Sequence, residues 1–225
     1  MPSFTQTGRP LRVSSPLPDG VLLLAGLRGR EAVGEQFAFE LHLLAPLALP
    51  PVEFDKLLGQ PLTATIDPGG GPPRLINGII AALHQDAQDR DFTHLSATVR
   101  PAWWVATLRT DSRYFQQQTV VDILKAVLGP FGPLDLKLTG TYPQRDYTCQ
   151  YRETDWAFAC RLMEEEGIFF SFSHADGKHT LVLSDTLANA PAVPLSSPVR
   201  YDTGTGSPDG RVYRCTRWRK TQELV

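Results

Sequence analysis

The sequence has 225 residues, and its hydrophobic content of 42% is sufficient for a folded core, which we expect to divide into two modules. Its 22 Lys and Arg residues nearly balance its 24 Asp and Glu residues, so the net charge of −2 excludes the strongly basic surface that attracts nucleic acid or anionic membrane. No apolar run approaches the roughly 18 residues that span a bilayer, and residues 1–15 lack the apolar centre of a signal peptide. We therefore expect a protein without a membrane anchor that is made and kept in the cytoplasm, unless a signal-independent machine exports it.

The first part of the chain alternates between short apolar runs and turn residues. Phe37, Phe39 and Leu41 show the period of two most clearly. The predicted strands are 11–17, 21–27, 37–44, 61–66, 74–83 and 92–100, with one helical turn at 54–58 and a polar turn at 83–91. Short strands at this spacing predict a β-barrel or sandwich over residues 1–105.

The glycine-rich segment 67–73, DPGGGPP, has two possible interpretations. A phosphate-binding loop requires backbone N–H donors and a Lys followed by Ser or Thr at the start of a helix. Pro72 and Pro73 lack the N–H group, no such Lys follows, and the next residues predict a strand. The composition therefore favours the tip of a hairpin.

Trp103 and Trp104 open the second part of the chain, in a segment without regular alternation. Adjacent tryptophans could line a sugar site, but aromatic rings mostly supply buried area, so we favour a role at the junction between the modules. Thr119 is a suitable N-cap for a helix over 120–128, whose apolar side chains recur along one stripe. A short strand is predicted at 134–138.

Tyr147, Cys149 and Tyr151 alternate with polar residues, which predicts a half-buried strand. We interpret Cys149 in this strand and Cys160 on an apolar helical face as small core residues. With Cys215 they form an odd and widely spaced set of three, which favours reduced thiols.

A helix is predicted over 156–166, closed by Gly167, which tolerates the positive φ of a helix C-terminus. Alternating residues after the helix predict a hairpin with an Asp-Gly turn. The helix ends in three acids, 164–166, that oppose the helix dipole. We expect Arg161, Arg152 or a partner chain to neutralise them.

The residues that carry chemistry give no positive indication of an enzyme. His174, Asp176 and His179 are the one cluster with compact metal-ligand spacing, but they lie at the predicted hairpin turn, where exposed polar residues are expected in any case. Consecutive acids such as 164–166 point about 100° apart around a helix, not across a cleft as a glycosidase pair does. No Gly-x-Ser-x-Gly motif is present. We predict no catalytic residue, no cofactor and no metal.

The string QYRETDWAFACRLMEEEGIFFSFSHADGKHTLVLSD at 150–185 resembles the VgrG family, the trimeric spike-tip proteins of bacterial type VI secretion systems, which are similar to phage tail hub proteins. Further family-like motifs occur in the family's order at 29–44, 57–66, 77–80, 100–116 and 119–128. The resemblance implies a structural role for the matching residues. They are Arg113, Phe115, Gln150, Tyr151, Glu153, Asp155, Arg161, Leu162, Glu165, Glu166, Gly167, His174, His179, Leu181 and Asp185.

The resemblance also implies a fold and a set of partners. The expected fold is mainly β with an inserted α/β part (α+β), built from phage tail hub-like β-barrel modules. The expected modules are a first barrel at 1–105, an α/β module at 106–190, and the start of a second, incomplete barrel at 191–225, where alternation predicts a strand at 211–218. Because this barrel breaks off at Val225, we expect a fragment or a truncated product.

The implied function is that of a spike component that forms a homotrimer and docks on the tube protein Hcp. It would deliver effector proteins, directly or through adaptor proteins, after assembly in the cytoplasm. It would then be exported, without a signal peptide, to the extracellular space or a target cell.

Two alternatives stay open at this point. A contractile-phage tail hub or baseplate protein shares these modules, and the sequence does not separate it from a secretion spike. A cell-wall carbohydrate-binding or hydrolytic module is the alternative of another class, and it would require Trp103, Trp104 or the acids 164–166 to face an open groove.

Overall fold

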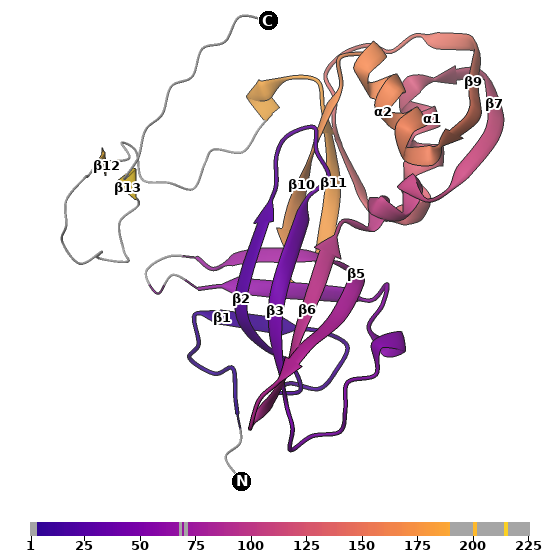
Figure 1. The fold of residues 1–225 in the computed structure, drawn as a ribbon. Helices are drawn as coiled ribbons and strands as arrows, with labels where there is room; N and C mark the ends of the chain where they lie inside the picture. Colours follow the sequence, from indigo (N-terminus) through magenta and orange to yellow (C-terminus); the bar gives the residue numbers. More distant parts are fainter. Residues whose placement is uncertain (1–3, 68, 70–71, 190–199, 202–213, 216–225) are drawn as a thin grey trace, which may run out of the picture.

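The computed structural model describes residues 4–67, 69, 72–189, 200–201 and 214–215. Six antiparallel strands near the N-terminus form one sheet that curls into a barrel (Figure 1). They are β1 Leu11–Ser14, β2 Leu23–Arg30, β3 Ala38–Pro46, β4 Pro61–Ile66, β5 Arg74–Gln88 and β6 Phe92–Arg100, in the order β1-β4-β5-β6-β3-β2. The two edge strands β1 and β2 lie next to each other, so the barrel is nearly closed. A 3-10 turn, η1 Phe54–Lys56, precedes β4.

The alternation of apolar residues determines which side of each barrel strand is buried. Phe39, Leu41 and Leu43 of β3 point into the core, as their period of two predicts. The hairpin interpretation of 67–73 is confirmed, because Ile66 at the end of β4 pairs with Arg74 at the start of β5.

Strand β5 is longer than predicted. The sequence suggested a polar turn over 83–91, but β5 continues to Gln88 and pairs with β6 through Ala87 and His94. The last five residues of β5 are exposed, and an exposed strand end needs no apolar alternation, because backbone pairing alone maintains it. Bulges in this pairing bend the long hairpin as it leaves the barrel.

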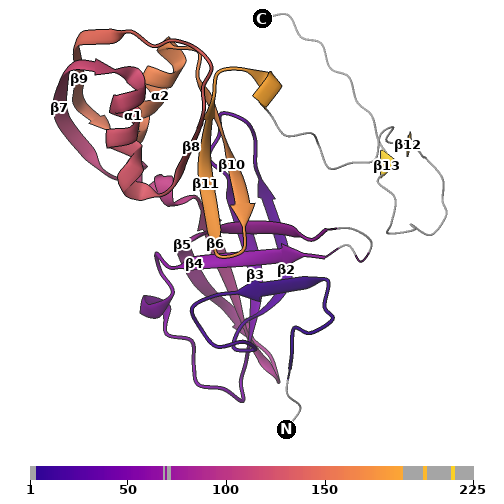
Figure 2. The ribbon, with the colours of Figure 1, turned by 180° about the vertical axis from the view of Figure 1, so that it is seen from behind.

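The second part of the chain combines two helices with two small sheets. Its elements are η2 Ala102–Thr107, β7 Thr110–Thr119, α1 Val120–Leu128, η3 Gly129–Phe131, β8 Leu134–Lys137, β9 Gln144–Thr154, α2 Asp155–Glu165, β10 Phe169–Ala175, β11 Lys178–Ser184 and η4 Leu187–Asn189. Strands β7 and β9 form an antiparallel pair, while β8 adds in parallel to the hairpin β10–β11. Helices α1 and α2 lie together on one side of the β7–β9 pair, which we call its inner side (Figures 1 and 2).

Local signals explain both helices. The side chain of Thr119 accepts a hydrogen bond from the backbone N–H of Asp122, and the Asp122 side chain accepts one in return, which is a capping box at the start of α1. The side chain of Thr154 caps α2 by accepting a hydrogen bond from the backbone N–H of Ala157. Gly167 has the predicted positive φ, at 68°.

The hairpin β10–β11 connects the two parts. It extends from the helices to strand β5 of the barrel (Figure 2), and Phe172 packs edge-on against Phe37 with ring centroids 5.1 Å apart. The buried residues form one cluster that runs from the barrel into the helical part. The expected boundary at 105–106 falls inside η2, and the division into modules stays a prediction.

Most of the expected second barrel, 191–225, lies outside the described residues, and so does most of the predicted strand 211–218. The described exceptions are β12 Arg200–Tyr201 and β13 Arg214–Cys215, which pair in parallel. Among the described residues, none of the helices combines the length and the apolar character that crossing a bilayer requires.

Candidate functional site

A buried ionic group lies where β7, β9 and α2 meet. Asp155 at the start of α2 is only 1% exposed, and its carboxylate forms ion pairs with Arg113 and, at 3.2 Å, with Arg109. Gln150 donates to the same carboxylate at 2.9 Å and accepts from Arg113 Nε at 3.0 Å. We call Arg109, Arg113, Gln150 and Asp155 the Asp155 cluster. It ties both strands to the first turn of the helix.

Two of the three acids at the end of α2, Glu165 and Glu166, are neutralised from within the chain. Arg145 at the start of β9 pairs with both Glu165 and Glu166, and Arg161 pairs with Glu165 at 3.2 Å. The hydrogen bond from Arg145, followed by that from Arg161, holds the pKa of Glu165 below its usual value. Arg161 was predicted in this role. The suggestion of Arg152 was wrong, because its side chain lies over the Tyr151 ring instead.

The pairing of Arg145 with Glu165 and Glu166 was not predicted, although the order of strand and helix in the sequence indicated it. Strand β9 runs directly into α2 at Thr154, and the chain reverses there, so the start of the strand lies beside the end of the helix. Arg161 also pairs with Glu153 at 2.7 Å and donates to the carbonyl of Cys149. The family-like residues Glu153, Arg161, Glu165 and Glu166 thus belong to one ionic network between strand and helix.

A second polar group joins the hairpin to the barrel. Asn77 of β5 donates from its side chain to Leu62 O at 3.3 Å and to Thr63 Oγ1 at 2.8 Å. Its side-chain oxygen lies 2.7 Å from Nδ1 of His179, and Nδ1 of His174 lies 3.1 Å from its backbone nitrogen. We call Thr63, Asn77, His174 and His179 the Asn77 joint. Through it the barrel fixes both strands of the hairpin.

The joint holds His179 in its neutral form. The N–H of Ala102 donates to Nε2 at 2.9 Å, so Nδ1 carries the proton and donates it to Asn77. Burial, with a further contribution from nearby His174, lowers the pKa of His179 to about 4. Nε2 of His174 lies 2.9 Å from the carboxylate of Glu31. Every ring nitrogen of both histidines therefore has a partner.

The expectation that His174 and His179 would be exposed at a turn was wrong. The strand register places them opposite each other, and the hairpin lies against the barrel, so that His179 is 8% exposed. Asp176 alone of the three lies exposed, at the turn. Within the described residues, no group of three or more His, Cys, Asp or Glu side chains is arranged to hold a metal ion.

Trp103 lies at the junction between the two parts, as predicted. It is fully buried, and its Nε1 donates to Leu128 O at 2.9 Å. Its ring contacts Phe172 and His179 of the hairpin. Trp104 is half-buried, with the Arg100 guanidinium 5.6 Å from its ring centroid. Trp103 therefore cannot serve as a sugar platform.

The remaining family-like residues stabilise the fold locally. Phe115 stacks on Phe158 of α2, while Leu162 and Leu181 are buried. Asp185 accepts hydrogen bonds from Thr139 N, Gly140 N and the Tyr142 hydroxyl, and these bonds, the one from Gly140 above all, lower its pKa to about 2.

Tyr151 is an exception among these residues, because it is exposed. Thr148 and Gln150 form the buried side of β9, and Cys149 lies with the tyrosines on the other side. The interpretation of Cys149 as a core residue was therefore wrong. Cys160 is partly buried and packs against the core, and burial raises the pKa of its thiol to about 11.

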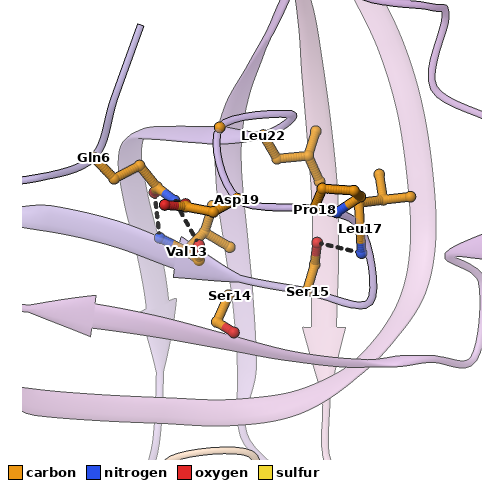
Figure 3. A pocket seen from close by; sticks show the side chains of 9 residues that line it. Gln6, Val13, Ser14, Ser15, Leu17, Pro18, Asp19 and Leu22 are labelled. Atoms are coloured by element: carbon orange, nitrogen blue, oxygen red, sulfur yellow. Dashed lines mark hydrogen bonds between the residues drawn. The ribbon is translucent and has the colours of Figure 1, made fainter.

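Several polar groups that line a small pocket near the N-terminus form hydrogen bonds with one another (Figure 3). Gln6 donates to Val13 O at 2.8 Å and to Asp19 at 3.0 Å, and it accepts from Val13 N at 2.7 Å. Because these atoms satisfy one another, the pocket offers few free groups to a ligand.

Comparisons with known proteins match this chain to phage tail and type VI secretion proteins. The model of the family described as phage tail baseplate hub (GPD) matches residues 30–225. The type VI secretion system spike protein VgrG1a of Pseudomonas aeruginosa is 41% identical over 182 residues, which cover 80% of this chain and 28% of that protein. The chain thus spans only about a quarter of the length of this relative.

Two solved structures share the fold. A type VI secretion component of E. coli, described as similar to the bacteriophage T4 tail proteins gp27 and gp5, matches with a TM-score of 0.68 and 20% identity, over 79% of this chain and 49% of that one. The 43 kDa tail protein of prophage MuSo2 from Shewanella oneidensis matches with a TM-score of 0.56 and 19% identity, over 85% and 55%.

Proposed function

Because the chain belongs to the phage tail baseplate hub family, we propose that it forms the hub portion of a type VI secretion spike protein. The observation that carries this proposal is the 41% identity to the spike protein VgrG1a, which extends over 80% of the chain. Three copies of the chain assemble into a ring, which docks on the tube protein Hcp and is delivered with effector or adaptor proteins.

The proposed role is mechanical and not catalytic. The family-like residues support this role, because most of them are engaged inside the chain. Asp155 and its arginines join strands to a helix, and His179 joins the hairpin to the barrel. The protein assembles in the cytoplasm and leaves with the spike.

The test measures assembly. Light scattering on the purified chain at several concentrations is expected to give a mass of about 75 kDa, which is three times the chain mass of 24.9 kDa. Added Hcp from the same bacterium is expected to form a larger complex. A monomer at all concentrations that also fails to bind Hcp would contradict the proposal for this region.

A contractile-phage tail hub is the second candidate, and the family description and the MuSo2 structure favour it. The same binding experiment separates the two, because a phage hub is expected to bind the tube protein of its own phage and not Hcp.

A further inference from the structure

The outer side of the β7–β9 pair carries an exposed row of tyrosines. Tyr114 is 70% exposed, Tyr147 57% and Tyr151 66%. Helices α1 and α2 cover the inner side of the pair, and the outer side faces away from the rest of the described protein (Figures 1 and 2). We call these three residues, with Arg152 beside them, the tyrosine face.

The row has the composition of a protein-binding surface. Tyr114 and Tyr147 stack across the two strands, with ring centroids 6.1 Å apart and an interplanar angle of 24°. Between the Ser112–Tyr151 pair and the Gln116–Tyr147 pair, the other side chains that alternate outward are Ser112, Gln116 and Cys149, so this stretch of the row contains no charged group. Tyrosine-rich patches with few charges are typical of interface centres, because tyrosine supplies a large contact area at a low cost in side-chain entropy.

Arg152 supplies the one cation of this face. Its guanidinium lies 5.3 Å from the Tyr151 ring centroid, and among the described residues it has no carboxylate partner. The other arginines around the pair are all engaged with carboxylates: Arg109, Arg113, Arg145 and Arg161. Arg152 is thus the guanidinium here that is left for an external anion.

The backbone at Arg152 adds an independent observation. Its φ is +50°, a conformation that side chains other than glycine rarely adopt, and it sits beside the register shift between Asp111 and Ser112. The Arg152 N–H donates to Ser112 Oγ at 3.2 Å, which helps to hold this geometry. The chain therefore accepts backbone strain where the guanidinium is presented on the face.

We propose that the tyrosine face docks a segment of another protein in which a carboxylate side chain lies next to apolar side chains. The carboxylate pairs with Arg152, and the apolar groups cover the tyrosine rings. The face contains no carboxylate of its own, so two copies packed face to face would leave both guanidinium groups without a counter-charge. The surface belongs to this chain whether or not the proposed trimer forms.

The test uses a phage-displayed library of random decapeptides, panned on the whole chain. The same library is depleted beforehand on the Tyr114→Ser/Tyr147→Ser variant. We expect enriched peptides to contain Asp or Glu beside aromatic, Leu or Pro residues. Synthetic versions of these peptides are expected to bind about ten-fold more weakly to Arg152→Gln and to the double tyrosine variant. Their affinity is also expected to fall as salt is raised.

Two control variants match these changes. Val33→Ser removes an equally exposed apolar side chain from the barrel, and Arg90→Gln removes an exposed arginine there; both are expected to bind the peptides normally. Arg152→Lys keeps the charge and is expected to retain part of the affinity.

Three results would overturn the proposal. The first is enrichment of peptides without acidic residues, or of peptides that bind all variants equally. The second is a change in the oligomeric mass of the chain caused by the tyrosine substitutions, which would assign the face to a second copy. The third is tyrosine-dependent sedimentation of the chain with purified cell-wall polysaccharide, which would assign the face to a sugar.

Discussion

The Asp155 cluster and the Asn77 joint both bury polar side chains, but they use opposite chemistry. The cluster lies inside the helical part and buries a full charge between two arginines. The joint lies between the barrel and the hairpin and uses only an amide, a hydroxyl and a neutral imidazole at its centre. A neutral joint avoids the cost of desolvating ions, whereas a buried ion pair is strongly destabilising once one partner is lost. The two regions should therefore differ in how they respond to substitution and to pH.

Loss of the buried anion is expected to have the largest effect. Asp155→Asn leaves Arg109 and Arg113 with only the partly exposed Asp111 as a counter-charge and should lower the free energy of unfolding by about 3 kcal/mol. This estimate is at the low end for buried ion pairs, because both arginines keep partial access to solvent. Urea denaturation measures the change. Asp146→Asn, which changes an exposed residue near the start of β9, serves as the control, and an equal loss in both variants would contradict the role of the cluster.

A neutral substitution in the joint should cost less. Asn77→Leu keeps the branched shape of the side chain but leaves Thr63 and His179 without their shared partner, and an expected loss of about 2 kcal/mol follows from unpaired buried polar groups. Hydrogen exchange should show faster opening of β10–β11, while β7–β9 stays protected. Gln85→Leu on the exposed end of β5 is the control. Unchanged exchange in the hairpin would show that the joint does not hold it.

The joint should also respond to acid in a defined window. The pKa of His179 is lowered from 6.5 to about 4, so between these values the unfolded chain binds a proton that the folded chain does not. The contribution of His179 is complete above pH 6.5 and is lost as the pH falls toward 4. Asp185, with its pKa lowered to about 2, acts below this window.

Unfolding measured across this pH range tests the assignment. His179→Gln should flatten the dependence between pH 6.5 and 4, whereas His42→Gln on the exposed side of β3 should leave it unchanged. An unaltered slope in His179→Gln would show that another group titrates in the window.

Local signals were sufficient to predict much of the fold. The helix over 120–128 matches α1, because its cap at Thr119 and its apolar stripe are both contained in the same few residues. The strands predicted at 61–66 and 92–100 match β4 and β6, because the residues that predict each strand also lie within the strand itself. The order of family-like motifs then indicated the hub family, which the fold alone would not have done.

Tertiary contacts determined what the sequence did not reveal. Hydrophobicity suggested that Cys149 points inward, yet Gln150 does, because Arg113 and Asp155 require its amide. Likewise, a histidine beside a turn appears exposed until the hairpin is placed against the barrel. In each case one partner, Arg113 for Gln150 and Asn77 for His179, lies 37 or more positions away in the chain, beyond the reach of local periodicity.

The smallest effect is expected at the end of α2, which sharpens the contrast with Asp155. Arg145 pairs with Glu165 and Glu166, but these side chains are partly exposed, and solvent screens such pairs. Arg145→Gln should therefore cost less than about 1 kcal/mol, and this loss should shrink further in high salt. A double-mutant cycle with Glu166→Gln isolates the pair. A coupling energy as large as the loss in Asp155→Asn would show that burial does not distinguish the two ionic sites. The acids that oppose the helix dipole would then depend on Arg145 far more than its exposure implies.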